Sequence, residues 1–125
     1  VRDPRVDLAI IETARGGLMR RGLPVPGAEV CLLTNIAADH LGTYGIMDVT
    51  ALADAKFQIA DAVKPGGRLV VVDFKPGDIP VGPPESHRIP QDKVVSELTE
   101  AGWTAGESLE LLPHQFVQVM LNPEG

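Results

Sequence analysis

The hydrophobic positions fall into short continuous runs and helical stripes, which together predict an α/β fold. The run Leu69–Val72, with Phe74 shortly after it, follows a Pro-Gly-Gly turn and is rich in β-branched residues. Such a run is typical of a strand buried on both faces of a parallel sheet. Val6–Thr13 and Glu29–Ile36 are two further strand candidates. We expect the sheet to be organised around Ala62–Phe74.

Two stretches have apolar residues at helical spacing. The first begins at Asp48 or Thr50 and runs to about Val63, with its stripe at Val49, Leu52, Ala53, Ile59, Ala60 and Val63. The second is Gln91–Ala101, which Gly102 is well placed to end. We expect these two helices to cover the two faces of the central strand.

The rest of the chain predicts a loop and a hairpin. Lys75–Pro90 is rich in proline and glycine and should be a mobile surface loop. Glu107–Leu112 and Gln115–Leu121 are separated by Pro113-His114, which is too short for a crossover, so they should pair antiparallel. The predicted fold is a single three-layer α/β domain over residues 1–125, with a mainly parallel sheet of about five strands and an antiparallel C-terminal hairpin.

Composition excludes several classes of partner. The formal net charge of −6 argues against nucleic acid, and no apolar run approaches the roughly 18 residues that a membrane span needs. The chain begins on the charged segment Val1–Asp7 rather than on a methionine, so we expect a processed or excised chain without a signal peptide. Cys31 is the single cysteine, which favours a reducing cytoplasm. The sequence leaves the oligomeric state open.

The first half of the chain resembles a ligase family. The stretches IIETARGGLMRRGL, LLTNIAADHLGTYGI and TALADAKFQIADAVKPGGRLV, between Val6 and about Val70, resemble the ATP-binding central domain of Mur-type ligases, and most closely that of the cyanophycin synthetases. These enzymes activate a carboxylate with ATP and join it to an amine through an acyl phosphate. The resemblance therefore implies magnesium and ATP as ligands.

The ligase resemblance also implies roles for four residues. Glu12 and His40 match metal-binding positions, Lys56 matches a lysine that helps to hold the second metal, and Asn35 lies in the segment that lines the nucleotide cleft. Glu12, His40 and Lys56 each have a plainer interpretation as well. Glu12 could simply end a strand, and Asp39 and His40 could make local turn hydrogen bonds. Lys56 interrupts an apolar stripe, so it must either reach solvent or pair with an acidic residue.

The second half resembles a different family. VKPGGRLVVVDF, DKVVSELTEAGW and ESLELLPHQFVQVML resemble the fifth strand, the next helix and the closing hairpin of class I S-adenosylmethionine-dependent methyltransferases. The two resemblances overlap in AVKPGGRLV. We therefore expect a chimera whose ligase-like part is about residues 1–70 and whose methyltransferase-like part is about residues 63–125, joined within residues 62–74.

Neither resemblance brings a complete site. The ligase family's Gly-rich phosphate loop and the methyltransferase family's cofactor loop are both missing from these residues. The leading hypothesis is an engineered or recombined scaffold with no catalytic residues and no cofactor. The alternatives are a magnesium- and ATP-binding ligase remnant, a methyltransferase remnant, or an enzyme completed by other chains. The remaining candidates have plain interpretations: a solvated loop for Arg15, Arg20 and Arg21, surface positions for His87 and His114, and an inert core thiol for Cys31.

Overall fold

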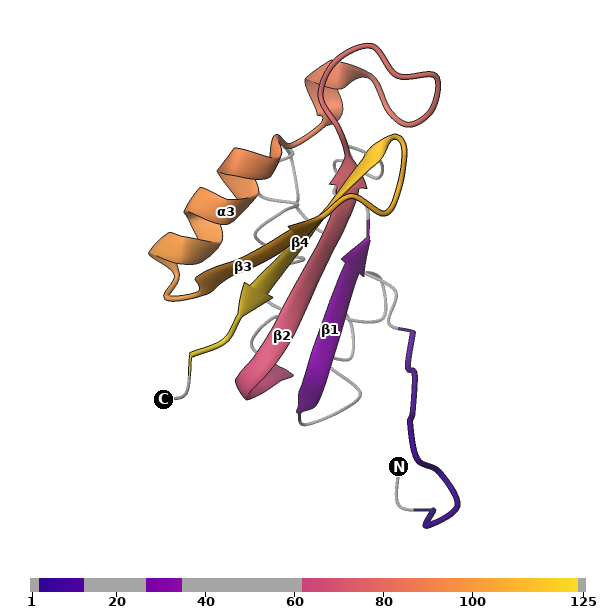
Figure 1. The fold of residues 1–125 in the computed structure, drawn as a ribbon, viewed down its shortest axis with the longest axis vertical. Coiled ribbons are helices and arrows are strands. Elements are labelled where there is room, and N and C mark those ends of the chain that lie inside the picture. The colour runs from indigo at the N-terminus through magenta and orange to yellow at the C-terminus, as the bar shows by residue number, and fades with distance from the viewer. Residues whose placement is uncertain (1–2, 13–26, 35–61, 124–125) are drawn as a thin grey trace, which may run out of the picture.

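The computed structural model describes residues 3–12, 27–34 and 62–123. In chain order the elements are β1 (Ala28–Thr34), β2 (Val63–Phe74), the 3₁₀ helix η3 (Glu85–His87), α3 (Gln91–Glu100), β3 (Thr104–Leu109) and β4 (Gln115–Leu121). The strands form one sheet in the order β1-β2-β4-β3, with α3 against one face (Figure 1). None of the helices in these residues is long and apolar enough to cross a bilayer.

The predicted central strand is confirmed. β2 lies between β1, which it pairs with in parallel, and β4, which it pairs with antiparallel. The predicted antiparallel hairpin is confirmed as the pair β3–β4, but its first strand begins three residues earlier than predicted, at Thr104 instead of Glu107, and ends at Leu109. The mixed α/β class holds, but five strands and a mainly parallel sheet are not confirmed. The described residues contain four strands, and only one of their three pairings is parallel.

The helix α3 matches the prediction to within one residue and ends as the sequence indicates. Gly102 has φ of +102°, a conformation that costs glycine little because it has no Cβ. Its N–H donates to the carbonyl of Thr99, and the N–H of Trp103 donates to the carbonyl of Leu98, both at 3.0 Å. This pair of bonds is a Schellman motif. It turns the chain back, and Trp103 packs against the core.

The core lies between α3 and one face of the sheet. On β2 it contains Leu69 and Val71, which are 1% and 0% exposed. β1 contributes Leu33, and β4 contributes Phe116 and Met120. The remaining members are Val94 and Leu98 on α3 and Ile89 just before it. Because cross-strand partners share a face, the register of Leu69 with Met120 and of Val71 with Leu33 sets this layer.

The opposite face of the sheet, called here the open face, is also apolar but much less covered. Val30 and Leu32 on β1 are 56% and 61% exposed, and Leu121 on β4 is 37% exposed. Val70, Val72 and Val119 on this face are only partly buried, whereas Val117 is buried. The predicted cover on both faces is therefore uneven in the described part of the chain.

The strand order fixes the relative directions of the strands. β2 and β3 are parallel, because each is antiparallel to β4 between them. β1, β2 and β3 therefore run in the same direction and follow one another in that order across the sheet. The connection from β2 to β3 contains α3 and passes over the face on which α3 packs. The helix predicted over residues 48–63 lies outside the described residues, apart from its last two positions. There Val63 already belongs to β2.

The Pro-Gly-Gly segment differs from the prediction. It lies within β2 as an irregularity instead of preceding the strand, because Ala28 pairs with Val63 while Val30 pairs with Arg68. Asn122, just beyond β4, satisfies the backbone there: its carbonyl accepts from the Gly66 N–H at 2.8 Å. Its own N–H donates to the Gly67 carbonyl at 3.0 Å, and its Nδ2 donates to the Val63 carbonyl at 2.8 Å. The strand therefore extends through a sequence that looks like a turn.

The predicted strand Val6–Thr13 is wrong for the residues that are described. Residues 6–12 form no strand and are exposed, with Leu8 and Ile10 at 78% and 89%. The segment lies to the side of β1 (Figure 1). It is preceded by a local turn in which Arg5 donates to the Asp3 carboxylate, an interaction that holds the pKa of Asp3 below its usual value. An apolar run indicates a strand, but it does not supply the neighbour with which a strand must pair.

Gly67→Ala should destabilise the protein by about 1–3 kcal/mol, as is usual for overpacking. A Cβ at Gly67 would lie 2.7 Å from the Glu29 carbonyl oxygen and 2.7 Å from Val63 Cγ1. Gly27→Ala is the matched control, because its nearest contact is the flexible Lys64 Cε at 3.3 Å. Urea unfolding of both variants measures the difference, and equal stabilities would contradict the close approach of β1 to β2.

Val71→Asp should abolish cooperative folding, because it places an unpaired charge at the centre of the core and so exceeds the usual loss of about 1 kcal/mol for a single substitution. Val81→Asp, at a position 48% exposed, is the control and should unfold like the parent. Circular dichroism during heating distinguishes them. If Val71→Asp retains one of two separate transitions, the two halves fold independently and β2 does not unite them.

Candidate functional site

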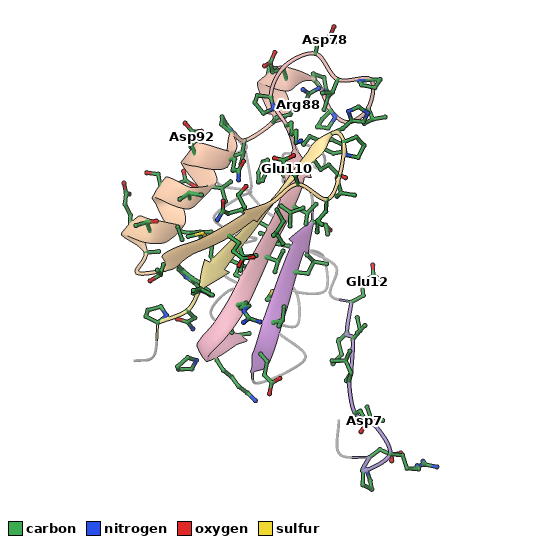
Figure 2. All side chains as sticks on the ribbon, in the orientation of Figure 1. Asp7, Glu12, Asp78, Arg88, Asp92 and Glu110 are labelled. Atoms are coloured by element: carbon green, nitrogen blue, oxygen red, sulfur yellow. The ribbon has the colours of Figure 1, made fainter. Side chains whose placement is uncertain are left out.

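The structure describes one of the four residues that the ligase resemblance marks. Glu12 is exposed and is the last described residue of the N-terminal segment. It lies far from Arg88 and Glu110, which are at the other end of the sheet (Figure 2). Asn35, His40 and Lys56, together with Asp39, lie outside the described residues. Within the ranges described, no group of three or more His, Cys, Asp or Glu side chains could hold a metal ion. The predicted magnesium site is therefore represented by a single carboxylate, which does not make a site by itself.

The carboxyl ends of the parallel strands are the usual place for a ligand in an open α/β sheet. β1 and β2 reach that edge at Thr34 and Phe74. Asp73, just before the end of β2, is only 1% exposed, and its Oδ1 accepts from the Phe74 N–H at 2.7 Å. The carboxylate thus helps to fix the backbone at the point where β2 leaves the sheet.

The segment after β2 is organised by one guanidinium. Arg88 Nε donates to the Pro83 carbonyl at 2.8 Å. Its Nη1 donates to the Gly77 carbonyl at 2.7 Å and to the Lys75 carbonyl at 3.3 Å. Glu85 Oε1 accepts from the Gly77 N–H at 2.9 Å. The predicted surface loop Lys75–Pro90 is therefore tied together by its own polar groups.

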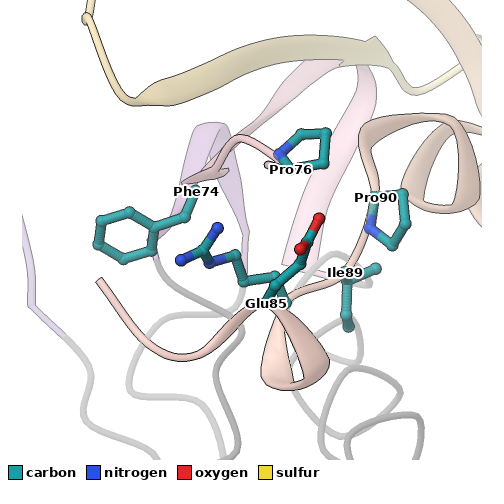
Figure 3. A pocket seen from close by; sticks show the side chains of 6 residues that line it. Phe74, Pro76, Glu85, Ile89 and Pro90 are labelled. Carbon is teal, nitrogen blue, oxygen red and sulfur yellow. The ribbon is translucent and has the colours of Figure 1, made fainter. Parts of the chain in front are cut away.

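These contacts surround a small cavity of about 70 Å³. Its labelled lining side chains are Phe74, Pro76, Glu85, Ile89 and Pro90 (Figure 3). Arg88 also lines it, with its guanidinium already engaged by backbone carbonyls. A cavity of this size holds a few waters at most. Its polar groups already bond to the loop itself, and it is much smaller than a typical ligand pocket, which measures several hundred Å³.

A larger open groove of about 570 Å³ lies beside the first turns of α3. Gln118, only 4% exposed, forms part of its lining. Gln118 Nε2 donates to the Val119 carbonyl at 2.9 Å and more weakly to those of Gly106 and Glu107, where β3 is irregular. Its Oε1 accepts from Gln91 Nε2, which also donates to Ser108 Oγ at 2.8 Å. Both amides are thus engaged in joining α3 to the β3–β4 hairpin.

The remaining candidates behave as structural groups. Cys31 is half-buried on β1, and burial raises the pKa of its thiol, which disfavours the reactive thiolate. Its interpretation as a weakly reactive thiol is supported, although it lies at the margin of the core. His114 is half-buried, and its carbonyl accepts from the Lys75 N–H at 2.9 Å. Arg15, Arg20 and Arg21 fall outside the described part of the chain, as does the side chain of His87.

Sequence reasoning missed Arg88 and Gln118. The sequence does contain a sign of the buried glutamine, because Gln118 interrupts the apolar run of β4. It contains no sign of the role of Arg88, since an arginine in a Pro-Gly-rich loop is ordinarily solvated.

Arg88→Met should loosen the loop between β2 and α3, because it removes three hydrogen bonds to backbone carbonyls. We expect a stability loss of about 1–3 kcal/mol and at least about tenfold faster amide exchange at Gly77, a factor that corresponds to 1.4 kcal/mol of local opening. Arg68→Met, at an exposed position on β2, is the control. Unchanged exchange at Gly77 would show that Arg88 does not hold the loop.

Comparisons with known proteins find two kinds of similarity. Over 71 residues, or 57% of the chain, the sequence is 44% identical to cyanophycin synthetases of Synechocystis sp. and Trichormus variabilis, and 38% identical to that of Crocosphaera subtropica. The match spans only 8% of the length of each relative. No protein-family model matches the chain.

The similar solved structures are of another kind. A SAM-dependent methyltransferase from Aquifex aeolicus superposes with a TM-score of 0.57 at 17% identity, covering 80% of this chain and 50% of the other. TnmH superposes with a TM-score of 0.51 at 19% identity, covering 78% and 31%. Identities this low establish the fold alone. The chain therefore resembles cyanophycin synthetase in the sequence of one part and SAM-dependent methyltransferases in its fold.

Proposed function

We propose that this chain is a chimeric α/β scaffold without an intact active site. It is one domain over residues 1–125, with a ligase-like part of about residues 1–70 and a methyltransferase-like part of about residues 63–125. The joint lies in β2, within residues 62–74. In this proposal the second part completes the sheet and brings no chemistry of its own.

The pairing of β2 is the observation that carries the proposal. β2 pairs with β1 from the ligase-like part on one side and with β4 from the methyltransferase-like part on the other. Without the second part, Leu69 and Val71 would lose β4, α3 and most of the core that buries them. An apolar strand left at an open edge invites aggregation. The C-terminal part therefore has a structural reason to be present.

The use made of the polar groups also supports a structural role. Phosphoryl chemistry needs a cradle of backbone N–H groups with a lysine, and methyl transfer needs a nucleotide-binding loop. The sequence of these 125 residues contains neither motif. In the described part, Arg88, Gln91 and Gln118 donate to carbonyls or side chains of the protein itself. These groups hold elements together, which suits a scaffold.

One observation favours a second candidate, a magnesium- and ATP-binding remnant of a Mur-type amide ligase. The 44% identity to cyanophycin synthetases extends over more than half of the chain, and Glu12, Asn35, His40 and Lys56 are the residues that would bind. A methyltransferase remnant is supported by the fold similarity alone. An enzyme completed by other chains is a further alternative.

Calorimetric titration of the chain distinguishes these proposals. With magnesium-ATP and, separately, with S-adenosylmethionine at millimolar concentration, we expect no saturable heat. Glu12→Gln and Lys56→Met are then indistinguishable from the parent. Saturable magnesium-ATP heat that both substitutions abolish would replace the scaffold with the ligase remnant. Saturable heat with S-adenosylmethionine would instead favour the methyltransferase remnant.

A further inference from the structure

We draw no further inference here: the strongest candidate, the open groove beside the first turns of α3, is lined by the amide side chains of Gln91 and Gln118, which already bond to the protein itself, and nothing in the structure shows what covers it.

Discussion

The described structure depends on the pairing of β2 on both sides. Its register with β1 aligns Val71 with Leu33, and its register with β4 aligns Leu69 with Met120. These side chains form the layer on which α3 packs. If either pairing shifted by one residue, the apolar side chains would move to the other face of the sheet. The position of the helix and of the C-terminal hairpin therefore follows from this one strand.

Buried polar groups reinforce the same arrangement. A buried amide costs free energy unless its donors and acceptors are satisfied. Gln118 meets this requirement by bonding the carbonyls where β3 is irregular and by accepting from Gln91 on α3. Asn122 does the same for the Pro-Gly-Gly segment of β2. In each case a side chain on one element fixes the irregular backbone of another.

The distribution of apolar surface gives the molecule two unequal faces. One face has α3, while the other keeps Val30 and Leu32 more than half exposed. Within the described residues, the buried core therefore lies on the α3 side of the sheet, where Leu69 and Val71 are almost fully buried.

The sequence by itself determined the local elements that depend on apolar periodicity and on turn or helix-ending residues. The stripe of α3 with Gly102, the central run of β2 and the short link between β3 and β4 all led to correct elements, because these signals act over a few residues. The lack of a strand over residues 6–12, the inclusion of Pro-Gly-Gly in β2 and the role of Arg88 were decided by tertiary structure. Each depends on a partner distant in sequence, such as Asn122 for Gly66, or on a loop closing around a guanidinium. The same reason limits the candidate site: the motifs name Glu12, but whether donors converge on it depends on contacts that no local pattern contains.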